Sequence, residues 1–132
     1  LTNDPDAPRI QEALEKLSMY ERRDEKVRQL NGGHRRRMEI ARALIHQPQV
    51  LLLDEPTVGL DAATRHAITD HVHELAADGM AVLWATHLVD EINDADKVVL
   101  LHQSKIIAEG TAQDLRKSQT LDEWFQQSTG AT

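Results

Sequence analysis

The stretch from Val50 to Asp61 constrains the fold of this chain more than any other. It reads Val-Leu-Leu-Leu-Asp-Glu-Pro-Thr-Val-Gly-Leu-Asp, so that four apolar residues end in two adjacent carboxylates, and a proline and a glycine then turn the chain. A short continuous apolar run is typical of a strand that is buried on both faces of a parallel sheet. We therefore expect residues 50–53 to form such a strand.

Asp54 and Glu55 come directly after this expected strand. In open α/β sheets, ligands bind beyond the carboxyl ends of the strands, so the two side chains are expected at the mouth of a site. One carboxylate can hold Mg²⁺ together with water and phosphate oxygens. Its neighbour can orient an attacking water or accept its proton. The alternative is a strand end whose acids only begin a loop.

A second candidate site is the segment Leu30-Asn31-Gly32-Gly33-His34, which is expected to open a helix. Two glycines let the backbone approach an anion closely, and the N-terminus of a helix presents unpaired N–H groups and a partial positive charge to it. Asn31 adds a side-chain donor or acceptor. The alternative is a turn that binds nothing.

His87 follows a second expected apolar strand, residues 80–85. A histidine at the carboxyl end of a strand can donate a hydrogen bond to a phosphate or contact an attacking water. His71 and His73 stand two positions apart on an expected helix, so they face different sides and form no metal site. Taken singly, the histidines other than His87 are expected to be structural or solvated.

Strand and helix patterns alternate along the chain, which predicts an α/β fold. The expected helices begin near residue 10, at the Gly32-Gly33 turn and after a cap at Asp61, and the last two end before Pro48 and Gly79. The remaining expected elements are a short helix around 89–92, strands over 98–101 and 106–108 around a turn at 102–104, and helices over 111–117 and 120–127.

Charge and composition narrow the classes of function. The net charge is −7, and residues 48–132 carry five basic against fourteen acidic residues, which argues against nonspecific nucleic-acid binding. The basic run Arg35-Arg36-Arg37 is either a solvated helix face or a field that favours polyphosphate. Without cysteine there is neither a disulfide nor a thiolate metal site. No apolar stretch approaches the roughly 20 residues that span a bilayer, so we expect a soluble, cytosolic chain.

Taken in this order, the motifs resemble those of the nucleotide-binding subunit of ABC (ATP-binding cassette) transporters, over about residues 9–125. Leu30–His34 resembles the signature loop of that family, Leu51–Asp54 its Walker B strand and Val58–Asp61 its D-loop. The usual signature is Leu-Ser-Gly-Gly-Gln, and this sequence departs from it at Asn31 and His34. Asn31 is still expected to donate a hydrogen bond through its amide.

The resemblance implies a role for each site residue. It makes Glu55 the catalytic glutamate and His87 the switch histidine, and it assigns Mg²⁺ to Asp54, through water. Two subunits, identical or different, would pair head-to-tail around ATP. The residues that close over the partner's ATP would be Asn31, Gly32, Gly33 and His34, and Asp61 would join the two sites across the interface.

The resemblance also implies the fold and the partners. The fold would be part of a P-loop NTPase with a mainly parallel sheet flanked by helices, and the ligands ATP and Mg²⁺. Residues 1–48 would belong to a helical subdomain, 49–110 to the ATPase core and 111–132 to a helical tail. A transmembrane permease, of the export type, would hold the subunit at the inner face of the cell membrane, and no nucleic acid is expected.

The phosphate-binding pattern Gly-x-x-x-x-Gly-Lys-Ser/Thr does not occur in these residues. On the resemblance, this chain is the C-terminal portion of a longer ATPase and is not expected to hydrolyse ATP alone. Two other interpretations stay open. One is an ABC-class ATPase that moves no solute, and the other is a non-catalytic ABC-like partner module.

Overall fold

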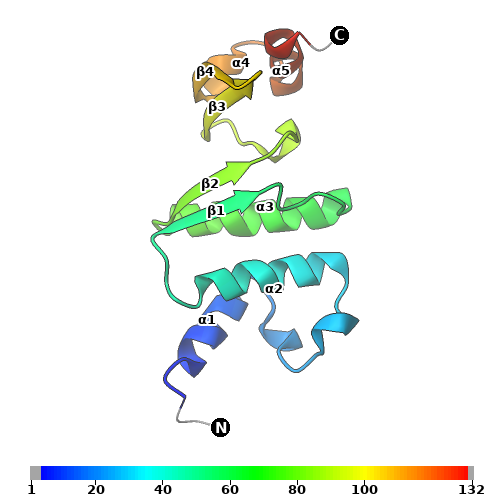
Figure 1. Cartoon of the computed structure of the whole chain (residues 1–132), viewed down its shortest axis with the longest axis vertical. Helices are drawn as coiled ribbons and strands as arrows, with labels where there is room; N and C mark the ends of the chain where they lie inside the picture. The colour runs from blue at the N-terminus through cyan, green and yellow to red at the C-terminus, as the bar shows by residue number, and fades with distance from the viewer. Residues whose placement is uncertain (1–3, 131–132) are drawn as a thin grey trace. The chain divides into compact units, whose positions relative to one another are not determined.

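Helices and strands alternate in the computed structural model, which describes residues 4–130 (Figure 1). These residues form two compact units, the first ending at Thr86 and the second beginning at His87. Among the described residues no helix is both long enough and apolar enough to cross a membrane.

The first unit is built around a parallel pair of strands joined by a helix. Asp54 at the end of one strand lies opposite Ala85 at the end of the other, which confirms the parallel pairing and the α/β fold class. Its elements are α1 (Ala7–Lys16), the 3₁₀ turns η1 (Tyr20–Arg22) and η2 (Val27–Gln29), α2 (Gly32–Leu44), β1 (Val50–Asp54), α3 (Ala62–Ala77) and β2 (Ala81–Ala85).

The two long helices begin at the residues that the sequence indicates. Asn31 caps α2, because its Oδ1 accepts the N–H of His34 at 2.8 Å. Asp61 caps α3 in the same way, with its Oδ1 accepting the N–H of Thr64 at 2.8 Å. Gly79 follows α3 with φ +106°, a left-handed conformation that glycine adopts without strain.

One face of the β1–β2 pair packs on the helices. Leu51 is buried there, in a core that also contains Ile40 of α2 and Ile68 of α3. The predicted burial of β1 on both faces is wrong, since Val50 and Leu52 are 57% and 69% exposed. In the described residues helices cover only one face of the pair, so alternate side chains of the apolar run point away from the core.

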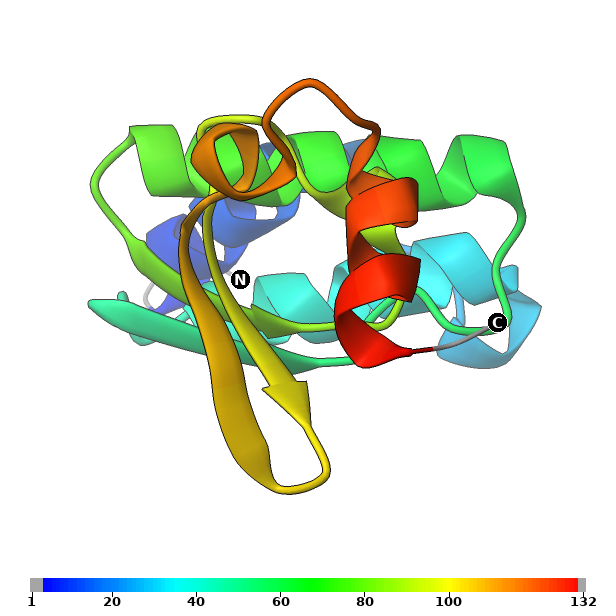
Figure 2. The ribbon, with the colours of Figure 1, turned by 90° about the horizontal axis from the view of Figure 1, so that it is seen from above.

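The second unit contains an antiparallel hairpin and two helices. The hairpin turns at Gln103 and Ser104, as predicted, and both have positive φ (Figure 2). Arg116 makes a bidentate pair with Asp94, in which Nε and Nη2 each lie 2.8 Å from a carboxylate oxygen. The elements are the single 3₁₀ turn η3 (Val89–Glu91), β3 (Lys97–His102), β4 (Lys105–Thr111), α4 (Ala112–Arg116) and α5 (Leu121–Thr129).

Leu51 and Leu52 are adjacent on β1 but differ in burial, 4% against 69% exposed. In residues 1–132, Leu51→Ala is expected to lower the free energy of unfolding by about 2–5 kcal/mol, because it leaves a cavity in the core. Leu52→Ala is the matched control and is expected to change it by less than about 0.5 kcal/mol. Urea unfolding followed by circular dichroism measures both, and equal losses would contradict the one-sided packing.

His71 of α3 is partly buried, and it lies near enough to Arg37 of α2 to be affected by its charge. Burial lowers the pKa of His71 below its ordinary value, and the positive charge of Arg37 lowers it further; Glu74 and Asp70 oppose both effects. Because the folded-state pKa is the lower one, the unfolded chain binds more protons below about pH 6.5. This ring therefore makes the fold less stable as the pH falls.

His71→Gln is expected to reduce the loss of melting temperature between pH 7.5 and 5.5, because it removes this uptake of protons on unfolding. Arg37→Met removes the positive charge but not the burial of His71, so it is expected to reduce this loss of melting temperature only in part. The measurement is the slope of melting temperature against pH for each variant. A slope in His71→Gln as steep as in the parent would show that this histidine does not contribute.

Candidate functional site

The N-termini of α2 and α3 lie at the same end of the first unit as the carboxyl ends of β1 and β2 (Figure 1). Each helix presents its partial positive charge at that end. The loops that bear Asn31 and Asp61 contact each other there, because a Cβ built on Gly32 would lie 3.2 Å from Cδ2 of Leu60. The connection from β1 to α3, which begins with Asp54 and Glu55, starts at the same end.

Glu55 is held at the end of β1 in an unusual backbone conformation. Its N–H donates to the carbonyl oxygen of Ala85 at 2.8 Å, which continues the pairing of β1 with β2 by one residue. Its φ is +47°, a value that favours glycine or asparagine over glutamate. Its Oε2 atom is shielded from solvent, whereas Asp54 is exposed. The two adjacent carboxylates therefore lie in different environments.

Asp54 fits the kind of magnesium site that takes one protein carboxylate. In nucleotide sites Mg²⁺ keeps several waters and binds substrate phosphates, with one or two carboxylates from the protein. Among residues 4–130, no three histidine or acidic side chains gather closely enough to hold a metal by themselves. An exposed carboxylate at the carboxyl end of a parallel strand suits the first arrangement.

The Asn31–His34 segment presents hydrogen-bond donors at the start of α2. The N–H of His34 is taken by Oδ1 of Asn31 at 2.8 Å, and the N–H of Arg35 by the carbonyl oxygen of Asn31 at 2.9 Å. The N–H groups of Gly32 and Gly33 precede the first helical bond and have no partner within the helix. Since Oδ1 of Asn31 serves as the cap, its Nδ2 remains as the donor. A serine hydroxyl would combine the two functions in one atom.

Positive charge gathers around this segment. Burial lowers the pKa of His34, and the charges of Arg22 and Arg37 lower it further, against a weaker opposing effect of Glu25. The neutral ring is therefore favoured at neutral pH.

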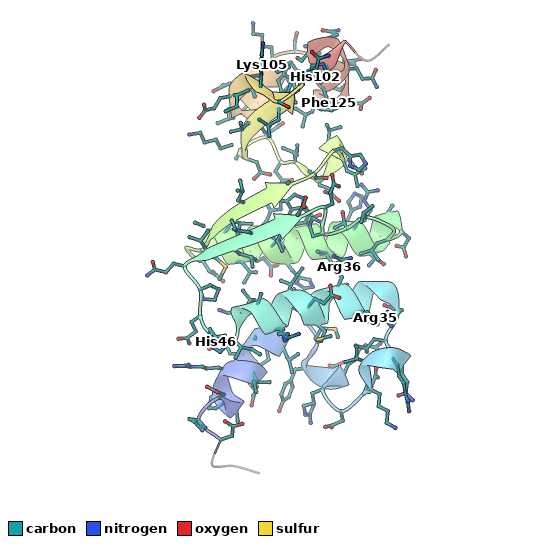
Figure 3. All side chains as sticks on the ribbon, viewed as in Figure 1. Arg35, Arg36, His46, His102, Lys105 and Phe125 are labelled. Atoms are coloured by element: carbon teal, nitrogen blue, oxygen red, sulfur yellow. The ribbon has the colours of Figure 1, made fainter. Side chains whose placement is uncertain are left out.

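The arginine run divides into three different environments. Arg35 is exposed near the N-terminal end of α2 (Figure 3), and Nε of Arg36 lies 3.6 Å from Oε2 of Glu39. Arg37 is partly buried, and within the described residues its Nε has no hydrogen-bond partner. The interpretation of the run as a solvated helix face therefore holds for Arg35 but not for Arg37. Whether the run attracts polyphosphate stays a hypothesis.

Asp61 is exposed, and Thr64 bonds both oxygens of its carboxylate. Thr64 donates its N–H to Oδ1 at 2.8 Å and its hydroxyl to Oδ2 at 3.1 Å. These bonds, the backbone one first, lower the pKa of Asp61. Thr64 is not among the predicted site residues, although its place three positions after the cap at Asp61 indicates that its N–H bonds the capping side chain.

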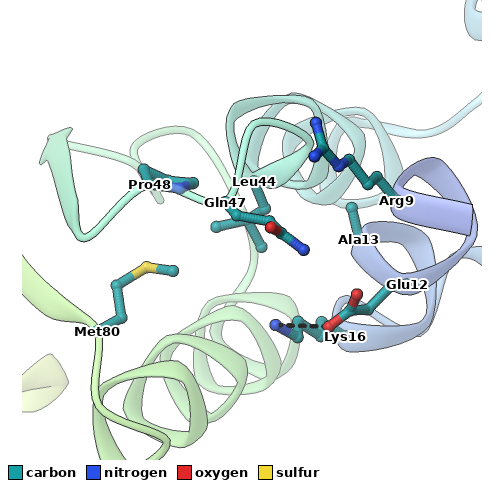
Figure 4. A pocket seen from close by; sticks show the side chains of 8 residues that line it. All are labelled: Arg9, Glu12, Ala13, Lys16, Leu44, Gln47, Pro48 and Met80. Carbon is teal, nitrogen blue, oxygen red and sulfur yellow. Dashed lines mark ion pairs between the residues drawn. The ribbon is translucent and has the colours of Figure 1, made fainter. Parts of the chain in front are cut away.

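The structure brings the predicted residues Asn31, Gly32, Gly33, His34, Asp54, Glu55 and Asp61 into one unit. His87 is exposed and is the first residue of the second unit, so its role at the site stays a prediction. A cavity of about 220 Å³ lies elsewhere in the first unit, near the other end of α2 (Figure 4). It is lined by Arg9, Glu12, Ala13, Lys16, Leu44, Gln47, Pro48 and Met80, none of which is a predicted site residue.

The sequence of the chain is similar to those of known proteins. Residues 2–58 match the family described as ABC transporter. The linearmycin resistance ATP-binding protein LnrL of Bacillus subtilis is 37% identical over 116 residues, which are 87% of this chain and 37% of that protein. The cobalt import ATP-binding protein CbiO of Rhodobacter capsulatus is 43% identical over 105 residues, which are 79% of this chain and 38% of that protein.

Solved structures agree with the sequence matches. An ATP-binding cassette of an ABC transporter in its ADP conformation superposes with a TM-score of 0.75 and 26% identity, over 95% of this chain and 51% of that chain. The predicted P-loop NTPase fold class is thereby confirmed. The chain spans less than two-fifths of the length of the two relatives and about half of the solved cassette. Sequence and structure therefore agree that the chain belongs to the ABC transporter family and is part of its ATP-binding domain.

Proposed function

We propose that this chain is part of the ATP-binding and ATP-hydrolysing subunit of an ABC transporter. The observation that carries the proposal is the conformation of Glu55. A glutamate with φ +47° is fixed to the end of the parallel pair by its own N–H, immediately after the exposed Asp54. Other non-glycine residues of the chain also have positive φ, and Glu55 differs from them in following the carboxyl end of a parallel strand, where ligands bind in α/β folds.

On this proposal three residues serve the subunit's own nucleotide. Glu55 orients the attacking water and accepts its proton, and His87 donates a hydrogen bond to the terminal phosphate. Asp54 holds Mg²⁺ through water, and the bound ion neutralises charge on the phosphate oxygens.

A second group of residues serves the nucleotide of a partner subunit, identical or different. The N–H groups that begin α2 and the amide of Asn31 bind its phosphate, with Gly32 and Gly33 allowing close approach and His34 beside them. Asp61 joins the two sites across the interface. Binding of ATP closes the pair and hydrolysis opens it, which is a shift between two populated states.

We further propose that a transmembrane permease reads this motion, and that the subunit lies at the inner face of the cell membrane. Export is the direction we propose; among the relatives one is named for Nod factor export and another for cobalt import. In this proposal residues 1–48 belong to the helical subdomain, 49–110 to the ATPase core and 111–132 to a helical tail. A nucleic-acid partner is not part of it.

Residues 1–132 alone are expected to bind MgATP weakly or not at all, because they contain no Gly-x-x-x-x-Gly-Lys-Ser/Thr loop to surround the phosphates. A protein that carries these residues together with such a loop is expected to bind MgATP with micromolar affinity. Isothermal titration calorimetry compares the two. Micromolar binding by residues 1–132 would contradict the proposed division of the site.

In that longer protein, Glu55→Gln is expected to bind ATP as the parent does and to hydrolyse it about 10²–10⁴ times more slowly, because the amide cannot accept the proton. Glu74→Gln, at an exposed position on α3, is the matched control and is expected to retain turnover. Phosphate release and nucleotide binding are measured on the same preparations. Turnover of Glu55→Gln within a few-fold of the parent would remove Glu55 from this role.

A further inference from the structure

Gly33 occupies a space that no larger residue fits. It is buried, and a Cβ atom built on it would overlap Cγ2 of Thr64 and lie 3.5 Å from Cβ of Thr64. The same atom would lie 3.6 Å from Oδ1 of Asn31, an ordinary contact. Gly33 has no positive φ, so its backbone conformation does not require glycine. The requirement comes from the methyl group of Thr64.

The other branch of the Thr64 side chain holds Asp61. Its hydroxyl donates to Oδ2 of Asp61 at 3.1 Å, while its backbone N–H donates to Oδ1 at 2.8 Å. In a β-branched residue one torsion angle places both branches. The hydrogen bond to Asp61 therefore also sets the direction of the methyl group toward Gly33.

Gly32, the neighbouring glycine, packs against a different residue. A Cβ on Gly32 would lie 3.2 Å from Cδ2 of Leu60, which is tighter than most real contacts of that kind. The turn before Leu60 is itself fixed, since the N–H of Leu60 donates to the carbonyl oxygen of Thr57 at 3.2 Å and Thr57 is 1% exposed. The N–H of Val58 donates to the carbonyl oxygen of Glu55 at 3.3 Å. A continuous set of short contacts thus runs from Glu55 to the glycine pair.

We propose that Thr64 is a positioning residue that joins the Asn31–His34 loop to Asp61, so that the two move as one piece. The inference rests on the proposed function, in which that loop binds the partner's ATP and Asp61 reaches across the interface. Displacement of the loop by a partner's nucleotide would then be carried through Thr64 to Asp61, and through Leu60 to the turn that begins at Glu55. Because packed atoms repel steeply at short distance, a methyl group is sufficient for this link.

The proposal predicts a rescue. In the longer protein, Gly33→Ala is expected to lower kcat about tenfold or more, because the new methyl collides with Cγ2 of Thr64 and moves the loop. Thr64→Ser removes that methyl and keeps the hydroxyl bonded to Asp61. The double variant Gly33→Ala with Thr64→Ser is therefore expected to recover kcat to within about threefold of Thr64→Ser alone.

Two further variants identify the atom responsible. Thr64→Val keeps the methyl and loses the hydroxyl, so it is not expected to rescue Gly33→Ala. Gly32→Ala meets Leu60 instead of Thr64, so Thr64→Ser is not expected to rescue it. The proposed contact is wrong if Gly33→Ala lowers kcat by the same factor with threonine and with serine at position 64. It is also wrong if Thr64→Ser restores kcat equally in the Gly33→Ala and Gly32→Ala variants.

Two measurements separate positioning from stability. The number of MgATP sites per subunit reports the folded fraction and is expected to stay at the parent's value. The fraction of ATP-closed dimer, measured by light scattering in the Glu55→Gln background, is expected to fall with Gly33→Ala and to return in the double variant. Recovery of melting temperature without recovery of the dimer would leave Thr64 a structural residue only. A parent that neither dimerises nor hydrolyses ATP would instead refute the proposed function.

Discussion

The packing of one face of β1 on α2 and α3 is the interaction on which the candidate site depends. Leu51 enters the same core as Ile40 and Ile68, and this fixes the direction of both helices relative to the strand. Both helices then begin where the strand ends (Figure 1). Two partial positive charges and a pair of carboxylates are thereby held at one end of the unit, where an anion and a metal ion are favoured together. The apolar core thus determines the geometry of a polar site, although the core residues themselves are not part of that site.

The features that the sequence predicts correctly are those in which a residue acts on its near neighbours. Asn31 and Asp61 each cap a helix by bonding an N–H three positions on, and Gly79 ends a helix by its own conformation. These effects need no tertiary contact, so residue type and position suffice to indicate them. The start of α2, the start of α3 and the turn between β3 and β4 follow from such local chemistry.

The features that the sequence does not predict depend on tertiary contacts, that is, on which distant segments of the chain pack against a residue. The apolar run of β1 has the same pattern whether one face is covered or two, which is why the exposure of Val50 and Leu52 was not foreseen. In the sequence, Thr64 is an ordinary threonine in the first turn of a helix. Its special place follows only from the fold, which brings Gly33 against its methyl group. Arg37 likewise differs from Arg35 in a way that only the fold shows, since its charge acts on His71 of α3 and lowers the pKa of that ring.

Glu55 shows how the structure adds to the meaning of a motif. A strand that only had to end and turn would do so at lower cost with glycine or asparagine, since φ +47° costs other residues roughly 1–2 kcal/mol. The conformation is held by the hydrogen bond to Ala85 and by the buried Pro56 and Thr57 that follow. Ser18, Gln47, Gln103, Ser104 and Lys117 also have positive φ, so the conformation of Glu55 gains its meaning from its place at the carboxyl end of a parallel strand.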